Sequence, residues 1–371
     1  MQEVKTENPL KRVSQFGQSL WYDGLLPPAD FQKLIREDGI RGATTNPTIF
    51  EKALSTGEYD ARIRQGLAGG KALEEIYKAL AVRAVQEVAD AFGPVFNETQ
   101  GRDGYVSIEV SPLLAHDTEN TVREARELWS LVKRDNVMIK VPATPQGIPA
   151  IRRLIAEGIN VNVTLIFSLE RYREVMNAYL EGLEGALKAG RPVLAIASVA
   201  SFFVSRVDTA VDGLLEEKIA LSPVVAKKES LKSMRGKAAI ANSKLAYREF
   251  ESVFTSIRFK ELEQKGAKKQ RPLWASTGTK NPAYSDVVYV EALIGPETVD
   301  TMPLSTMDAF RDHGRPTLKV RESVNEAEKF LKNLETEGIL LKKVTAELEK
   351  AGVQSFSDSY QKILKGIESK K

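Results

Sequence analysis

Short apolar segments alternate with amphipathic helical segments along most of the chain, and this alternation restricts the fold more than any other feature. Most of the apolar segments lack polar residues at every second position, which is typical of parallel strands covered on both faces. Apolar residues at helical spacing over 71–92 and 118–134 predict helices between strands, as in an α/β fold. The predicted strands begin near Ser19, Arg41, Gly104, Asn136, Asn160, Pro192, Arg271 and Glu297.

Eight strands of this kind predict a closed (β/α)8 barrel, the TIM barrel, with additional helices. The alternative α/β fold is an open, doubly wound sheet. That fold commonly carries GxGxxG after its first strand or GxxxxGK[ST], and neither pattern occurs in those places here. The barrel is therefore the predicted fold.

Three parts of the chain are longer than simple strand connections: residues 51–103, 207–270 and 320–371. The interval 207–270 contains a helical pattern rich in basic residues. We interpret that pattern as a solvated helix face, with attraction of phosphate as the alternative. Residues 320–371 are charged and helical, and we expect them to pack on the outside of the barrel. Without a Gly/Ser/Pro-rich linker or a short repeat, residues 1–371 are expected to form one domain with a helical extension at about 320–371.

Charge and residue content exclude several functional classes. The 53 Lys and Arg residues nearly balance the 50 Asp and Glu residues, and a net charge of +3 gives no electrostatic basis for binding nucleic acid or an anionic membrane. The absence of cysteine excludes disulfides, thiol nucleophiles, iron–sulfur clusters and Cys-ligated zinc. His116 and His313 are the only histidines and have no metal-binding spacing, so no metal site is predicted. His116 stands beside Asp117 at a predicted helix start, where a capping turn is expected.

The sequence also lacks the signals of membrane targeting. Residues 1–18 contain no apolar run of the roughly 7–15 residues that a signal peptide needs, and no segment approaches the ~20 apolar residues of a membrane span. We therefore expect a soluble, cytoplasmic protein. The sequence does not determine the oligomeric state, and a homo-oligomer is left open.

Ionisable and polar residues interrupt the apolar strands. Because burying such a residue without a partner destabilises the fold, each one indicates either a structural partner or a function. Lys140 follows Val137–Ile139 and is either a snorkelling surface residue or a partly dehydrated nucleophilic amine. Glu109 and Asp23 are either members of structural ion pairs or acid–base groups. Asn162 and Thr164 are two residues apart and point to one face, as a core hydrogen-bonded pair or as site residues.

Taken together, these residues favour catalysis. Asp23, Glu109, Lys140 and the pair Asn162 and Thr164 lie late in four predicted strands, and a barrel carries its active site at that end of the strands. A lysine nucleophile with two carboxylates and no metal ligands fits carbon–carbon bond chemistry through a Schiff base.

Two later segments have the composition of anion-binding loops. Ser201–Arg206 follows a predicted strand and opens a helix, so its hydroxyls, early N–H groups and Arg206 can hold an oxyanion. Trp274–Lys280 also follows a strand and contains hydroxyls, a glycine and a cation, as do phosphate loops after late barrel strands. For either segment alone, a solvated cation after a strand is the simpler explanation.

Two motifs resemble those of a known enzyme family. Gly42–Phe50, GATTNPTIF, is similar to the N-terminal signature of transaldolases, and Val137–Thr144, VMIKVPAT, resembles the segment that carries their Schiff-base lysine. Supporting matches run from Trp21–Asp23 through Asn162–Ser168 to Ser201–Arg206, so that the resemblance covers most of residues 15–310.

The resemblance implies an enzyme of the pentose phosphate pathway with a (β/α)8 barrel and no cofactor. Its reaction moves a dihydroxyacetone unit from sedoheptulose 7-phosphate to glyceraldehyde 3-phosphate, giving erythrose 4-phosphate and fructose 6-phosphate. Lys140 would be the Schiff-base nucleophile and Asp23 the acid–base group that takes the C4 hydroxyl proton. The other implied roles are a water held by Glu109 and Thr164, dihydroxyacetone hydroxyls positioned by Asn46, Asn162 and Ser201, and a phosphate held by Arg206.

One segment departs from the family pattern. Many members have an arginine within two residues of the serine that corresponds to Ser276, whereas here Thr277–Lys280 follows, so Lys280 is a candidate replacement that offers a point charge without a bidentate fork. The length fits the longer bacterial type of transaldolase and argues against the much shorter fructose-6-phosphate aldolases. Two alternatives remain, a Schiff-base aldolase that releases free dihydroxyacetone and a non-catalytic sugar-phosphate-binding barrel, which would have to lack Lys140 or Asp23.

Overall fold

The computed structural model describes residues 8–371, and within them eight parallel strands close into a barrel in chain order. The predicted (β/α)8 barrel is confirmed. The strands are β1 Gln18–Asp23, β2 Ala43–Thr44, β3 Val106–Glu109, β4 Val137–Pro142, β5 Val161–Ile166, β6 Ser198–Phe203, β7 Arg271–Ala275 and β8 Thr298–Met302. All eight were predicted, although β6 begins at Ser198 and not near Pro192, because Val193 lies in a bend and Leu194 and Ala195 in a turn before pairing starts.

Closure of the sheet follows from the two neighbours of β1. Tyr22 is in register with Ala43 of β2, and Leu20 is in register with Asp300 of β8, both in parallel orientation. A closed parallel sheet has no free edge, and helices cover its outer face. This explains why the strands are buried along nearly their whole length.

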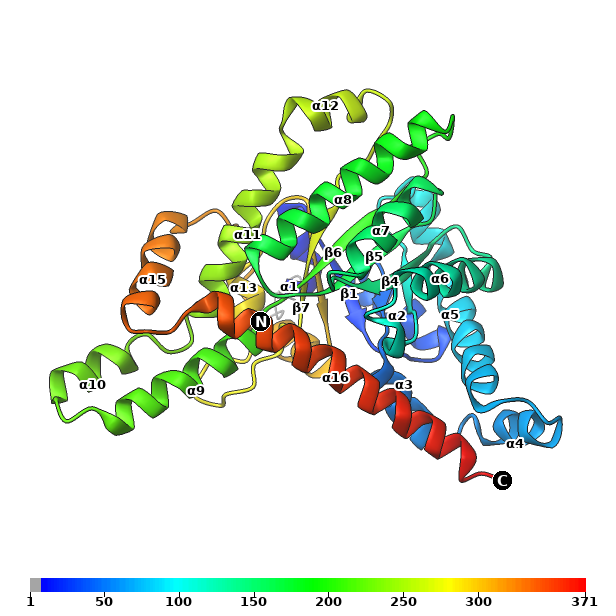
Figure 1. The fold of residues 1–371 in the computed structure, drawn as a ribbon, viewed down its shortest axis with the longest axis horizontal. Helices are drawn as coiled ribbons and strands as arrows, with labels where there is room; N and C mark the ends of the chain where they lie inside the picture. Colours follow the sequence, from blue (N-terminus) through cyan, green and yellow to red (C-terminus); the bar gives the residue numbers. More distant parts are fainter. Residues whose placement is uncertain (1–7) are drawn as a thin grey trace, which may run out of the picture.

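Helices fill the connections and the two ends of the chain (Figure 1). The predicted helix 71–92 is present as a longer helix that continues past Pro94, and the helix at 118–134 begins after Asp117, whose side chain accepts a hydrogen bond from the Asn120 N–H. His116 lies in that capping turn, as predicted, with Nδ1 3.4 Å from Oε1 of Gln146.

The α-helices are α1 Pro9–Val13, α2 Pro28–Asp38, α3 Pro47–Ser55, α4 Asp60–Ala68, α5 Leu73–Glu98, α6 Thr118–Val132, α7 Gly147–Ala156, α8 Leu169–Lys188, α9 Ser205–Leu221, α10 Val225–Lys232, α11 Ala238–Phe254, α12 Ile257–Glu263, α13 Val288–Ala292, α14 Leu304–His313, α15 Val324–Thr336 and α16 Leu341–Glu368, with short 3-10 helices at Ser14–Phe16 and Pro112–Leu114 (η2). No helix among residues 8–371 is long and apolar enough to cross a membrane.

The basic helical pattern within 207–270 divides into two helices with different surroundings. Lys227 and Lys232 on α10 are exposed, so the predicted solvated face is correct there. The prediction is wrong for α11, where Lys244 is only 8% exposed and its Nζ donates to the backbone oxygen of Glu322 at 2.8 Å. Helix α11 is buried because α8, α9 and α15 all pack against it.

The C-terminal helices do not both lie outside the barrel. Helix α15 packs on α11, as expected for an outer helix, but α16 packs on α3, α9, η2 and β5 at the carboxyl-terminal end of the barrel. Figure 1 shows α16 in red, running past α9 and α3 toward α4. A glycine permits its close approach, since a Cβ at Gly352 would lie 2.9 Å from Cδ2 of Leu165. The prediction that residues 320–371 pack on the outside is therefore wrong for α16.

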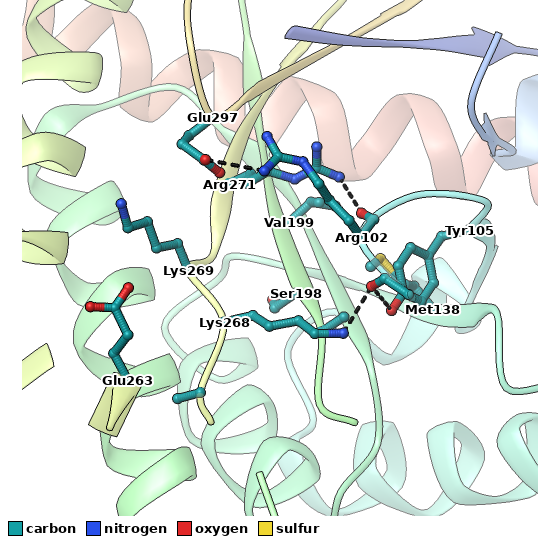
Figure 2. A pocket seen from close by; sticks show the side chains of 13 residues that line it. Arg102, Tyr105, Met138, Ser198, Val199, Glu263, Lys268, Lys269, Arg271 and Glu297 are labelled. Carbon is teal, nitrogen blue, oxygen red and sulfur yellow. Dashed lines mark hydrogen bonds and ion pairs between the residues drawn. The ribbon is translucent and has the colours of Figure 1, made fainter. Parts of the chain in front are cut away.

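A buried ion pair closes the opposite, amino-terminal end of the barrel. Arg271 donates to Asp103 at 2.8 Å, to Ser19 at 2.9 Å and to the backbone oxygen of Arg102 at 2.7 Å. Burial disfavours the charged form of Asp103, but the nearby Arg271 outweighs this effect and holds the pKa of Asp103 below its usual value. A cavity of about 330 Å³ opens beside this pair, and Figure 2 shows Arg102 paired with Glu297 at its rim.

Candidate active site

A second cavity, of about 280 Å³, lies at the carboxyl-terminal end of the strands. Barrel enzymes carry their active sites at this end. Eight of the ten residues proposed from the sequence line this cavity, and the other two, Glu109 and Asn162, touch residues that do. The eight are Asp23, Asn46, Lys140, Thr164, Ser201, Arg206, Ser276 and Lys280.

Lys140 is held inside the barrel by two neighbours. It lies on β4 between Glu109 of β3 and Asn162 of β5 in register, and the residue is 5% exposed. Its Nζ donates to the backbone oxygen of Thr45 at 3.0 Å and to Oε2 of Glu109 at 3.3 Å. The amine is therefore fixed in position beside a carboxyl group that can exchange a proton with it.

Glu109 lies behind Lys140, where it meets a separate cavity of about 250 Å³ that Tyr77 and Tyr360 also line. Its side chain is 6% exposed. Burial raises the pKa of Glu109, although the positive charge of Lys140 opposes the shift. A carboxyl group with a raised pKa keeps a proton at a higher pH than an exposed glutamate does, and can pass it to a neighbouring group.

Asp23 ends β1 on another side of the same cavity. The Thr44 hydroxyl donates to its Oδ1 at 2.8 Å, and Thr44 lies 2.7 Å from the Thr301 hydroxyl of β8. Burial raises the pKa of Asp23, and the charge of Lys140 is the largest opposing effect. The Thr44 hydroxyl, itself hydrogen-bonded to Thr301, thus orients a carboxyl group that is suited to proton transfer.

Asn162 and Thr164, the polar pair predicted on one face of β5, differ in their hydrogen-bond partners. Asn162 donates from Nδ2 to Ser107 at 2.9 Å and accepts at Oδ1 from Ser201 at 2.7 Å, so its amide group is occupied by protein partners. The buried Thr164 hydroxyl has no hydrogen-bond partner among residues 8–371. It lines the cavity, where it is available to a water molecule or a substrate.

Asn46 combines a structural contact with a free amide. Its Oδ1 accepts from the Ile49 N–H at 3.0 Å and caps α3. Its Nδ2 makes no hydrogen bond within the described part of the chain and remains for a ligand. Ser201, by contrast, lies inside β6, and α9 starts only at Ser205, so the expectation that the helix-opening segment begins at Ser201 is wrong. Local sequence shows the apolar run but not the residue at which strand pairing stops.

Two predicted anion-binding segments meet at the outer part of the cavity. The Ser205 and Ser276 hydroxyl oxygens lie 2.9 Å apart, and the Ser205 N–H donates to the backbone oxygen of Ser276 at 3.1 Å. Arg206 lies in the first turn of α9, with its guanidinium 5.4 Å from the centroid of Phe203, and burial lowers its pKa. With Lys280, which is exposed, it gives this part of the cavity two positive charges.

Sequence reasoning missed three kinds of lining residue. Lys52, an exposed cation, lies six residues after Asn46 on α3, and that proximity to the recognised motif was the available signal. Thr44 on β2 orients Asp23 directly, and Thr301 on β8 holds the Thr44 hydroxyl. Phe356 on α16 lines the cavity with its ring centroid 5.6 Å from Nζ of Lys140, and no local pattern indicated its placement.

No group of three or more His, Asp or Glu side chains that could hold a metal ion occurs within residues 8–371. His313 pairs with Asp286 at 2.8 Å and Asp312 at 3.0 Å, away from the cavity. The chemistry that this site offers therefore comes from an amine, two carboxyl groups, hydroxyls and cations.

The fold and the cavity define a (β/α)8-barrel enzyme built around a buried lysine. The family model described as Transaldolase/Fructose-6-phosphate aldolase matches residues 20–367, and the chain belongs to this family. A transaldolase of Thermobifida fusca is 48% identical over 363 residues, covering 96% of each chain. A transaldolase of Trichodesmium erythraeum is 44% identical over 370 residues, covering 98% of this chain and 97% of the relative. A transaldolase of Mycolicibacterium smegmatis is 46% identical over 365 residues, covering 96% of each chain.

Proposed function

We propose that this chain is a transaldolase, which moves a dihydroxyacetone unit from sedoheptulose 7-phosphate to glyceraldehyde 3-phosphate. The products are erythrose 4-phosphate and fructose 6-phosphate. The observation that carries the proposal is the buried Lys140 amine, 3.3 Å from Glu109, in a cavity that also contains Asp23. Full-length similarity to proteins named transaldolase supports the same reaction.

The first half-reaction forms the Schiff base. With its proton transferred to Glu109, the Lys140 amine attacks the C2 ketone of the donor, and a nitrogen-bound proton moves to the ketone oxygen to give a carbinolamine. Loss of that oxygen as water produces the iminium. Glu109, with its raised pKa, is the proposed proton donor for this step, and the Thr164 hydroxyl, which has no partner among residues 8–371, holds the departing water.

Cleavage of the carbon–carbon bond follows. Asp23 removes the proton of the C4 hydroxyl, the C3–C4 bond breaks, and its electron pair moves into the iminium to form an enamine. Erythrose 4-phosphate leaves with a new aldehyde group. In the second half-reaction the enamine carbon attacks glyceraldehyde 3-phosphate, protonated Asp23 returns its proton to the aldehyde oxygen, and water releases fructose 6-phosphate from Lys140.

The cations at the outer part of the cavity are proposed to hold the substrate phosphate. Arg206 and Lys280 line the cavity beside Ser276, and Arg206 lies in the first turn of α9, where the helix dipole also favours an anion. Asn46 and Ser201 also line the cavity and are proposed to bind the dihydroxyacetone hydroxyls, with Asn162 positioning Ser201. The proposal requires no cofactor, because the lysine adduct itself accepts the electron pair. A place in the pentose phosphate pathway and a cytoplasmic location belong to the same proposal and rest on the family resemblance.

The test is borohydride trapping with fructose 6-phosphate, peptide mapping and product analysis with and without erythrose 4-phosphate. A transaldolase should give a reduced adduct on Lys140 and should make sedoheptulose 7-phosphate and glyceraldehyde 3-phosphate when the acceptor is present. Release of free dihydroxyacetone at the same rate with or without acceptor would favour the fructose-6-phosphate aldolase alternative. Absence of both adduct and turnover would refute both.

A further inference from the structure

Helix α16 places an aromatic side chain directly against the proposed Schiff-base lysine. The Phe356 ring centroid lies 5.6 Å from Nζ of Lys140, and Phe356 is 3% exposed. It is separated from Lys140 by more than 200 positions in sequence and reaches the site only because α16 crosses the carboxyl-terminal end of the barrel. The other nearby partners of the amine, Glu109 and the Thr45 carbonyl, are polar, so Phe356 supplies the apolar side of its surroundings.

Contacts on both sides of Phe356 hold this part of α16 in place. One turn before it, Gly352 approaches Leu165 of β5, and one turn after it, the Ser359 hydroxyl lies 3.0 Å from the hydroxyl of Thr48 on α3. Leu165 has a φ of +59°, and the register of β5 with β6 shifts between Val163 and Ile166, so this residue packs outside the regular ladder. The position of Phe356 is thus set by well-packed neighbours.

The enamine that the proposed reaction leaves on Lys140 can react in two ways. Attack on an acceptor aldehyde forms a new carbon–carbon bond. Alternatively, the same carbon takes a proton from water, leaving hydroxide and an iminium. Hydroxide then adds to the iminium carbon, the carbon–nitrogen bond breaks, and dihydroxyacetone leaves as the amine is regenerated. Which path is taken depends on whether water can reach the enamine carbon, because excluding water suppresses such side reactions.

We propose that Phe356 determines this outcome by covering the enamine and keeping water from protonating it. The inference rests on the proposed transaldolase function. It adds a structural reason why the three-carbon unit is transferred to an acceptor aldehyde and is not released as free dihydroxyacetone. Phe356 is a specificity-determining residue here, because it selects between acceptors for the three-carbon unit without taking part in proton transfer.

Three variants separate water exclusion from other effects of the ring. Phe356→Ala removes the apolar cover, whereas Phe356→Leu keeps apolar bulk and loses only the π face that could contact a cation. Ile363→Ala is the matched control, since Ile363 is a buried residue of α16 that does not line the cavity. Each variant is first checked for a folded state by circular dichroism and thermal unfolding.

The measurement compares dihydroxyacetone release from fructose 6-phosphate without acceptor with transfer to erythrose 4-phosphate. In Phe356→Ala the ratio of release to transfer should rise at least about tenfold, while Phe356→Leu should change it by less than about threefold. In D2O the released dihydroxyacetone should carry one carbon-bound deuterium, visible by NMR.

An unchanged ratio in folded Phe356→Ala would overturn the inference, as would an equal rise in Ile363→Ala, which would assign the effect to general loosening of α16. An equal rise of the release-to-transfer ratio in Phe356→Leu would assign the effect to the contact between the ring and a cation, and it would overturn water exclusion as the cause. Failure of the proposed function looks different, because the unmodified enzyme would then form no adduct or show no transfer.

Discussion

Glu109 and Lys140 are register partners on β3 and β4, and Oε2 of the glutamate lies 3.3 Å from the lysine Nζ. Both side chains are 6% exposed, so solvent screens their interaction far less than at the surface. Removing one member of a buried ion pair commonly costs ~3–5 kcal/mol because the other charge is left without a partner. Here the raised pKa of Glu109 gives the remaining carboxyl group a way to become neutral.

Lys140→Ala should therefore fold and yet lose all turnover and all borohydride trapping. Among the described residues that line the cavity, Lys140 carries the only buried amine, and protonation of Glu109 limits the damage that its removal does to the fold. Lys244→Met is the control, because the Lys244 amine donates to the Glu322 backbone outside the cavity and its loss should leave the adduct intact. Mapping of the reduced adduct to Lys280 or Lys244 in the unmodified enzyme would show that the nucleophile is assigned wrongly.

Arg206→Ala should raise KM by roughly 10–100-fold with a smaller change in kcat, since hydrogen bonds to charged groups contribute about 1.5–3 kcal/mol. The guanidinium is proposed to hold the substrate phosphate equally in the ground state and the transition state. Steady-state kinetics on Arg206→Ala and on Arg36→Ala, which removes an exposed arginine that does not line the cavity, provide the comparison. A drop in kcat at unchanged KM would contradict a role in phosphate binding.

Much of the fold and the inner part of the site could be predicted from local sequence. Strand segments such as Val137–Pro142 are apolar on both faces, and one polar residue within them, Lys140, stands out against that background. Because parallel strands in a barrel share one carboxyl-terminal end, late polar residues of different strands must lie near one another. Asp23, Lys140 and Thr164 are three such residues, and all three line the same cavity.

The parts that could not be predicted depend on tertiary packing. The sequence of α16 predicts a charged helix, but it does not tell which surface the buried residues of that helix cover, so the place of Phe356 beside Lys140 could not be predicted. The ion pair between Arg271 and Asp103 joins residues 168 positions apart and was missed for the same reason. The start of β6 at Ser198 is set by pairing with β5, and an apolar run alone does not contain that information.

Chelation should not change activity. The proposed chemistry uses an amine and carboxyl groups, and the side chains within residues 8–371 form no cluster suited to a metal ion. Activity measured before and after incubation with EDTA and removal of the chelator should agree. A large loss that a divalent metal restores would place the enzyme in the metal-dependent class of aldolases.

Asp300→Asn should stabilise the protein, and more so at pH 8 than at pH 5. Asp300 is buried with Oδ2 unpartnered within the described residues, and burial raises its pKa to about 7 from 3.8, partly offset by the Thr277 hydroxyl at 2.8 Å. Its contribution to stability is complete below pH ~4 and is lost as pH rises toward ~7, because the unfolded chain ionises first. The difference in unfolding free energy between variant and unmodified protein should grow by roughly 2–3 kcal/mol between pH 5 and pH 8. Urea titrations at the two pH values check this, and an equal difference at both would contradict the raised pKa.

Asp23→Asn should separate proton transfer from binding. The substitution keeps nearly the same shape and can still accept the Thr44 hydrogen bond, but it removes the base that takes the C4 hydroxyl proton. General acid–base catalysis typically contributes ~10²–10⁴-fold, so kcat should fall by that factor while fructose 6-phosphate still forms a borohydride-reducible adduct on Lys140.

The pH profile supplies a second readout for the same residue. Because burial raises the pKa of Asp23, and the base must be ionised to act, kcat/KM of the unmodified enzyme should decline on the acid side at a higher pH than an ordinary aspartate would give. Asp23→Asn should lose that limb of the profile and retain only the low residual rate. Normal turnover in the variant would show that the base is unnecessary. Failure to form the adduct at all would show that Asp23 acts before or during Schiff-base formation. Either result would rule out a role for Asp23 confined to the cleavage step.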